Sequence, residues 1–168
     1  MKSLLKVFSI IVLLCLINLS TSFSQYVLNG DLFSIVFPVE PTLEVSDIDT
    51  DLGKVKMFTY SYQPSDYLFY AFSYCDYPPQ SKGLDEASAL DKAMKGFANG
   101  MSLDISSNTA ISLGNVKGVY FKADDDEIFA TNKSYFVKNR LYQIAVVSSD
   151  YYCSSQIEAS FLDSFKIK

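Results

Sequence analysis

The order of apolar and polar positions predicts an alternation of strands, helix, strands and helix. Segments typical of β-strands are 32–37, 42–47, 54–62, 105–113, 116–123, 127–138 and 141–149. Short polar turns separate the last four, at 114–115, 124–126 and 139–140. Because such short turns join neighbouring strands that run in opposite directions, the spacing favours antiparallel hairpins.

A further strand is predicted at 67–77, where the sequence reads YLFYAFSYCDY. Leu68, Tyr70, Phe72 and Tyr74 fall on one face, and Phe69, Ala71 and Cys75 fall on the other. A strand that is apolar on both faces is usually covered on both faces. We therefore expect this strand to lie in the middle of the fold.

The period changes to that of a helix at 84–101. Ala87, Leu90, Met94, Phe97 and Met101 recur at spacings of three and four, which predicts a helix with this stripe in the core. Asp85 and Glu86 are expected in its first turn and Gly100 at its C-cap. A second, shorter helix is predicted at 154–165, where Ser155 and Glu158 have the spacing of a capping box.

The chain of 168 residues is therefore expected to hold one domain, residues 25–168, with an α+β fold. Its mostly antiparallel β-sheet would carry the two main helices packed on it.

Residues 1–24 are predicted to be a signal peptide. Lys2 and Lys6 precede an apolar run at 7–19, and small residues follow to Ser24, so cleavage is expected between Ser24 and Gln25. The run is shorter than the roughly 20 residues of a membrane span, so no membrane insertion is expected after cleavage. The predicted location is periplasmic or secreted.

Cys75 and Cys153 remain after this cleavage. In an oxidising compartment they could form a disulfide, or they could be two separate buried thiols; the sequence leaves both readings open.

The charge of the chain argues against nucleic acid as a partner. Its formal net charge is −5, and loss of Lys2 and Lys6 would make it −5 − 2 = −7. An acidic surface repels phosphate backbones.

Two acidic motifs resemble metal sites. DIDTDLG at 47–53 fails the pattern of a calcium loop, because the glycine falls one position late and position 12 is Phe58. We interpret 49–53 as a hairpin turn, and DDDE at 124–127 as a solvated hairpin tip. Neither is expected to hold a metal.

The chain contains no histidine, which removes the common Ser-His-Asp and Cys-His nucleophile systems. It carries no Gly-rich phosphate-binding motif, and no cofactor is expected. NKS at 132–134 matches a glycosylation sequon.

Several stretches together resemble a group of small exported bacterial proteins of unknown function: FSIVFP at 33–38, TDLGKVKM at 50–57, SYCDYP at 73–78 and FLDSFK at 161–166. More distantly, the arrangement is similar to the PsbP-like fold. That resemblance implies an α/β/α sandwich and non-enzymatic binding or accessory roles, by analogy with extrinsic photosystem II subunits and related proteins. It implies no site residue here.

The sequence therefore predicts an exported, non-enzymatic envelope protein that binds a protein or an envelope component. The alternatives are a carbohydrate or small-ligand binder that uses exposed Tyr or Phe rings, and a carboxylate-based hydrolase. An enzyme would bring two acids together in a pocket with displaced pKa values. A sugar binder would expose coplanar rings, and a partner-binding module would expose an apolar patch with a polar rim.

Overall fold

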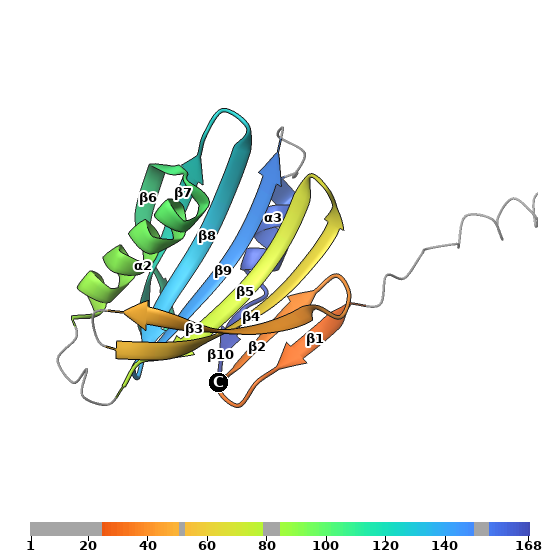
Figure 1. Ribbon diagram of the computed structural model, residues 1–168. Helices are drawn as coiled ribbons and strands as arrows, with labels where there is room; N and C mark the ends of the chain where they lie inside the picture. Colours follow the sequence, from red (N-terminus) through yellow and green to blue (C-terminus); the bar gives the residue numbers. More distant parts are fainter. Residues whose placement is uncertain (1–24, 51–52, 79–84, 150–154) are drawn as a thin grey trace, which may run out of the picture.

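Two antiparallel sheets and two helices make up the part of the chain that the computed structural model describes, which is residues 25–50, 53–78, 85–149 and 155–168 (Figure 1). The larger, seven-stranded sheet has the order β3 (Thr42–Thr50), β4 (Gly53–Ser65), β5 (Leu68–Asp76), β9 (Arg140–Ser149), β8 (Ile128–Val137), β7 (Val116–Asp124) and β6 (Asp104–Leu113). The smaller, three-stranded sheet has the order β1 (Tyr26–Asn29), β2 (Phe33–Phe37) and β10 (Lys166–Ile167). The helices are α2 (Glu86–Met101) and α3 (Ser155–Leu162).

The large sheet consists of two meanders joined at their inner strands. Strands β3, β4 and β5 pair in chain order, as do β6, β7, β8 and β9. Antiparallel pairing of β5 with β9 joins the two halves, with Phe72 opposite Ile144 and Tyr74 opposite Tyr142. The predicted α+β class, with a mostly antiparallel sheet and two helices, is confirmed.

One side of the large sheet, here called the aromatic face, holds the largest part of the core. Phe72, Tyr142 and Ile144 point to this side and are fully buried. The covering side chains come from β2, from α3 and from the turn after α3. These are Phe33, Ile35, Phe37, Phe161, Leu162 and Phe165. Figure 1 shows α3 and the small sheet on the opposite side of the large sheet from α2.

The other side, here called the helix face, is covered by α2. Ala89, Leu90, Met94 and Ala98 of α2 are buried, and the helix contacts β6, β7 and β8. The predicted stripe is therefore right for Leu90 and Met94 but wrong for Ala87, which is exposed. The buried face of α2 is therefore centred closer to Ala89 and Ala98 than the predicted stripe.

The ends of α2 also differ from the prediction. Asp85 is the N-cap rather than a first-turn residue, and its carboxylate accepts a hydrogen bond from the Ser88 backbone N–H at 3.2 Å. Gly100 stays helical, and Ser102 takes the left-handed conformation at φ 58° that ends the helix. The second helix is shorter than predicted and ends at Leu162.

The predicted strands are all present, and two further short strands were not predicted. β1 pairs with β2, and the two-residue β10 pairs with β2 through Lys166 opposite Ser34. The last hairpin turn lies one residue earlier than predicted, at Lys138 and Asn139, which both have positive φ. Asp124 to Glu127 form the predicted hairpin tip, where the Asp125 carboxylate accepts hydrogen bonds from the N–H groups of Glu127 and Ile128. Those bonds lower the pKa of Asp125.

Arg140 joins the small sheet to the large one. Its guanidinium makes two 2.6 Å hydrogen bonds to Asp76 on β5 and a 3.1 Å bond to Asp31, which follows β1. It also stacks on the Tyr74 ring, 4.8 Å from the centroid. The bond from Arg140 lowers the pKa of Asp31. The arginine side chain is only 12% exposed, so this ion pair is better shielded from solvent than a surface pair.

Gly118 on β7 is the glycine whose replacement tests the packing of the aromatic face. An added Cβ would lie 2.5 Å from a Tyr135 ring carbon and 2.6 Å from the Ser134 carbonyl oxygen. We expect Gly118→Ala to lower the free energy of unfolding by about 1–3 kcal/mol, because a backbone atom cannot move aside easily. Urea denaturation measures this change. Gly96→Ala, where a Cβ would meet nothing within 4 Å, is the control and should not destabilise. Equal effects of both variants would contradict the described packing.

Candidate functional site

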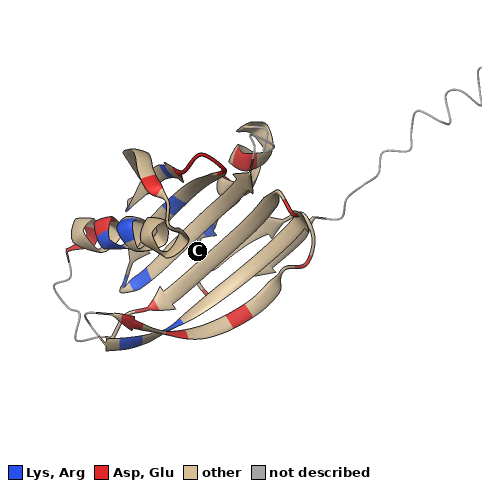
Figure 2. Cartoon of the chain, turned by 45° about the horizontal axis from the view of Figure 1, so that its top comes forward, with Lys and Arg blue, Asp and Glu red and all other residues tan. Residues whose placement is uncertain are grey.

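The helix face is only partly covered. Figures 1 and 2 show α2 over one half of this face. The β3–β4 hairpin covers another part, where Val55 is buried against Cys75 and Leu141. The middle of β4 and β5 presents small or polar side chains there, among them Ala71, Ser73 and Ser61, which are half-buried. Figure 2 also shows that these strands carry charge mainly at their ends. The middle of this face, between α2 and the hairpin, is therefore only half-buried.

A groove of about 670 Å³ runs between α2 and the β3–β4 hairpin, and its lining includes Leu141 and Gln143 of β9. Its volume lies within the range that small-molecule sites in proteins occupy. The apolar part of its lining is Ile48, Met57, Tyr77, Phe97, Met101 and Leu141. Segments that are far apart in the chain thus form one apolar trough, which we call the α2 groove.

The polar groups of the α2 groove lie mainly at its edge. Lys92, Lys95 and Asn99 stand on α2, and Asp49 stands on β3. Lys95 forms an ion pair with Asp91 at 2.8 Å, and Asp49 lies 3.7 Å from Lys54. Among the described residues, Asp49 is the one carboxylate in the lining. The groove thus has a mixed polar rim rather than a pair of facing acids.

Gly96 and Gly100 form part of the helical wall of the α2 groove. A Cβ built on either of them would meet no atom within 4 Å beyond its chain neighbours and the nearby backbone of α2 itself. The described fold therefore does not need glycine at these positions. A glycine inside a helix costs roughly 0.5–1 kcal/mol relative to alanine. The two glycines lower the wall of the groove and leave α2 open to close approach.

The floor of the α2 groove connects to a buried polar row beneath the helix. Gln143 donates weakly to the Ala93 carbonyl oxygen at 3.4 Å and lies 3.5 Å from the Ser134 hydroxyl. Ser134 in turn donates to the Asn132 side-chain oxygen at 2.8 Å. Asn132 is fully buried, and its amide nitrogen has no hydrogen-bond partner within the described part of the chain. The sequon at 132–134 is therefore inaccessible in the folded protein.

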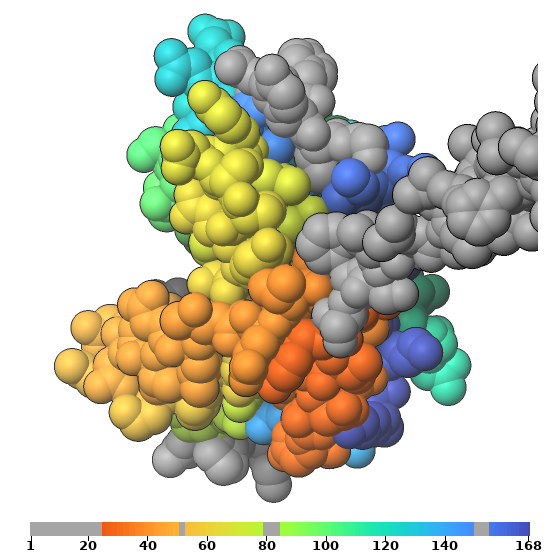
Figure 3. Space-filling model, turned by 90° about the vertical axis from the view of Figure 1, so that its right-hand side faces the viewer, coloured from red at the N-terminus to blue at the C-terminus, as the bar shows by residue number. Residues whose placement is uncertain are grey.

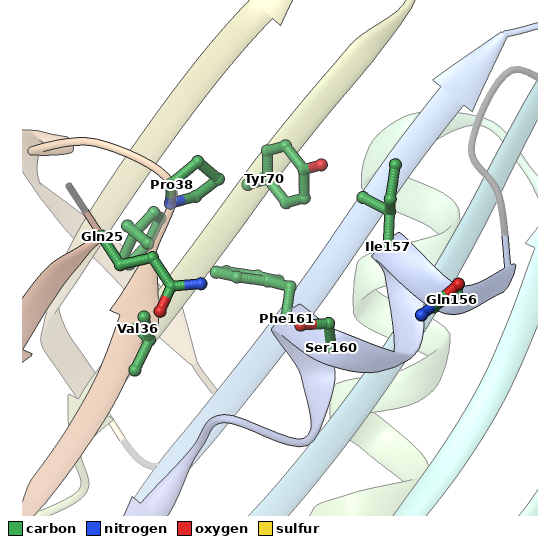
Figure 4. Close-up of a pocket in the computed structure, with 9 residues that line it drawn as sticks. Gln25, Val36, Pro38, Tyr70, Gln156, Ile157, Ser160 and Phe161 are labelled. Carbon is green, nitrogen blue, oxygen red and sulfur yellow. The ribbon is translucent and has the colours of Figure 1, made fainter. Parts of the chain in front are cut away.

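A second, smaller cavity of about 450 Å³ lies on the aromatic side, between β2 and α3 (Figure 4). Figure 4 shows the Phe161 ring pointing from α3 toward β2, with Val36, Pro38 and Tyr70 around it. Its polar groups, among them Gln25 and Ser160, are neutral. This cavity is an opening in the core packing, and none of the described side chains that line it is charged.

The acidic motifs have structural roles. β3 and β4 pair up to Thr50 opposite Gly53, so the hairpin predicted at DIDTDLG is confirmed; residues 51–52 lie outside the described part. Asp47 pairs with Lys56 across the hairpin at 2.9 Å. In the residues that can be described, no group of three or more His, Cys, Asp or Glu side chains could hold a metal ion.

The stacked rings of β4 and β5 are cross-strand pairs on the aromatic face. Phe58 stacks on Tyr74 at 4.9 Å, and Tyr62 stacks on Tyr70 at 6.1 Å, with interplanar angles of 10° and 11°. Tyr70 is buried and the other three rings are half-buried. These rings use their faces on one another, as cross-strand aromatic pairs do, and do not form the open platform that a sugar binder would need.

Of the two readings left open for Cys75 and Cys153, the structure favours separate thiols: Cys75 carries a free, buried thiol, whereas Cys153 lies outside the described residues. Cys75 pairs with Leu141 near the start of β9, and the strand continues to Ser149, roughly 27 Å away at ~3.4 Å per residue. Four more residues span at most about 14 Å. A bridge needs Cα atoms about 4.4–6.8 Å apart, so the described strands hold Cys75 too far away.

The expected signal peptide, residues 1–24, lies outside the described residues. Gln25, which would follow the cleavage after Ser24, is the first residue that the structure describes. Within the described residues, neither helix has the length and apolar character needed to cross a membrane.

A comparison with known proteins finds no family model that matches the chain and no curated protein that matches it. The α2 groove is therefore judged on its own geometry.

The Cys75 thiol should resist chemical modification in the native protein. Burial raises its pKa from 9.0 to about 11, so at pH 8.5 the folded chain holds the unreactive thiol form. Because the folded pKa lies above the unfolded one, this group favours folding below pH 9 and loses that contribution as the pH rises toward 11.

Iodoacetamide treatment followed by mass spectrometry tests this. We expect no alkylation of Cys75 in native protein at pH 8.5, and full alkylation of both Cys75 and Cys153 in guanidinium chloride without reductant. A Cys75–Cys153 linked peptide, or rapid native alkylation of Cys75, would contradict the described burial.

Proposed function

We propose that this protein is an exported, non-enzymatic binding protein of the bacterial envelope, which holds a partner or envelope component in the α2 groove. The observation that supports this most is the apolar trough of about 670 Å³ between α2 and the β3–β4 hairpin, which has a polar rim. Apolar concave surface left open in a small domain usually marks a binding site.

The two glycines of α2 give a second reason to assign binding to this groove. Gly96 and Gly100 weaken the helix, and no contact within the described fold requires them. Glycine allows close approach of another backbone or ligand to a helix. A bound partner that lies against α2 would account for both positions.

The charged groups fit a binding role better than a catalytic one. The acids with displaced pKa values, Asp31 and Asp125, have lowered values, and each is fixed by an arginine or by backbone N–H groups. A general acid would need a raised pKa and a place in a cavity. Among the described residues, the hydrolase alternative has one observation in its favour, a small cavity of about 210 Å³ that Asp124 and Glu158 line. The larger, mostly apolar α2 groove favours binding.

Export and the distant kinship with the PsbP-like fold are part of the proposal. Export is supported by the basic start and apolar run of residues 1–24. The kinship is supported by the layers of the fold, with α2 on one face of an antiparallel sheet and α3 on the other. A binding or accessory role is what that kinship would imply.

Site-specific photo-crosslinking in a bacterial host tests the proposal. The full chain carries p-benzoylphenylalanine in place of Gly96 in the groove, or in place of Ala87, which is exposed on α2 outside the groove. On irradiation of intact cells, we expect a discrete crosslinked product from position 96 and none from position 87. The crosslinked species is then identified by mass spectrometry.

Measuring the free energy of unfolding of the Gly96 variants separates an effect on binding from an effect on folding. Gly96→Ala should raise the free energy of unfolding by about 0.5–1 kcal/mol, because it improves the helix in open space. In a further variant the crosslinker replaces Asn99, and Gly96→Leu places a large side chain in the α2 groove. This variant should lose the discrete crosslinked product. Equal crosslinking from positions 96 and 87, or none from either, would overturn the assignment of the groove.

A further inference from the structure

The outer edge of β3 is the second surface that the described fold leaves open. β3 ends the strand order of the large sheet, and all its residues except Ile48 and Thr50 are exposed. Figure 3 shows the β3–β4 hairpin projecting from the rest of the molecule. A strand in this position presents unpaired backbone N–H and C=O groups along its outer side.

The other edge strand, β6, has the features by which proteins protect an edge. Its register shifts at a bulge between Ile105 and Ser107, and its exposed middle is polar, with Asn108 and Thr109. β3 pairs with β4 through its whole length without a shift. The two edges thus differ, and only β3 is regular enough to receive another strand.

The apolar layer of the aromatic face stops abruptly at β3. Across the sheet, buried Phe72 lies opposite half-buried Tyr60, which lies opposite Leu43. Leu43 and Val45 are each 48% exposed, and both point to this face. One more strand outside β3 would continue the layer and cover both side chains.

A second copy of β3 does not fit this edge. In a symmetric antiparallel pair of two β3 strands, one residue lies opposite its own copy at the centre, and the aromatic faces of both copies point the same way. If at least five residues pair, that central residue is one of 44 to 48. Centring on Glu44 sets Glu44 against itself, and the registers centred on 45 and 46 set an acid opposite Leu43. Centring on Asp47 or Ile48 sets acid against acid. Like charges directly opposite each other destabilise a strand pair.

The pairing of β3 with β4 shows which sequence does fit. Lys54 and Lys56 lie opposite Asp49 and Asp47, which keep 82% and 63% of their side chains exposed. Further along, Phe58 lies opposite Val45. The inner partner of β3 therefore reads basic–x–basic–x–apolar–x–apolar. Glu44, opposite Thr59, leaves a place for one more basic residue.

We propose that the β3 edge binds an extended polypeptide segment of another protein, which adds as an antiparallel strand. The segment would read basic–x–basic–x–apolar–basic–apolar, with its apolar residues over Val45 and Leu43 and its basic residues opposite Asp49, Asp47 and Glu44. Backbone hydrogen bonds hold the segment, and the alternate side chains select it. This proposal does not depend on the α2 groove, and it stands if the groove binds nothing.

A designed peptide tests this directly. Its sequence, Lys-Val-Lys-Met-Phe-Lys-Tyr, copies residues 54–60 with lysine in place of Thr59, and it is acetylated, amidated and fluorescently labelled through a short linker. Fluorescence anisotropy with the purified protein measures its affinity at 50 and 300 mM salt. We expect saturable binding that weakens with salt, because exposed charge pairs are screened. A peptide with glutamate at all three basic positions should not bind.

Charge reversal in the protein gives the decisive comparison. Glu44→Lys should weaken the lysine peptide about five-fold and improve a peptide with glutamate at the matching sixth position by a similar factor. Glu127→Lys changes charge equally at the β7–β8 turn and should leave both affinities unchanged. Val45→Asp should weaken the lysine peptide at least about ten-fold, and Gly96→Leu should have no effect.

Three outcomes would overturn the proposal. The first is binding that is equal for the lysine and glutamate peptides, or absent for both. The second is a Glu44→Lys variant that behaves like Glu127→Lys. The third is a dimer, detected by analytical ultracentrifugation, that Val45→Asp dissociates, because the edge would then be occupied by a second copy. Failure of crosslinking at Gly96 would bear on the groove alone.

Discussion

The two inner strands, β5 and β9, carry apolar side chains on both of their faces, and the rest of the fold follows from the need to cover both. Phe72 and Tyr142 on one face are fully buried, as are Cys75 and Leu141 on the other. Burial of such side chains is the main favourable term in folding. The faces differ in the size of what they carry. The aromatic face takes α3 and a complete second sheet, whereas the helix face, with smaller residues, takes α2 and the end of the β3–β4 hairpin. The α2 groove is the result of this unequal cover.

Much of the fold could be predicted from local pattern, because the strands and α2 each carry their own periodicity. β1 and β10 could not, because they are only four and two residues long, and β10 pairs with a strand far away in the chain, with Lys166 opposite Ser34. The C-terminal end of α2 was mispredicted because glycine is the common residue there, whereas Ser102, two residues after Gly100, takes the left-handed conformation.

The α2 groove could not be predicted, because its lining comes from β3, β4, Tyr77, α2 and β9, which share no motif. Its distinctive residues are alanine, glycine and glutamine, which suggest no chemistry when read along a sequence. One signal was present: Gly96 stands in the middle of a helix, where glycine is unfavourable. For the β3 edge, the exposed Leu43 and Val45 gave no signal either, since alternation predicts a strand without saying whether its neighbours lie on one side or both.

The burial of Asn132 has a practical consequence for producing this protein. Eukaryotic secretory cells attach glycans to a nascent chain while it is still unfolded, when the 132–134 sequon is accessible. A glycan attached there could not be placed beneath α2, where Asn132 is fully enclosed, so the modified chain could not complete its core. Yeast or mammalian secretion would therefore divide the product between a folded, unmodified form and a misfolded, glycosylated one, whereas a bacterial host that lacks this modification would yield a single species.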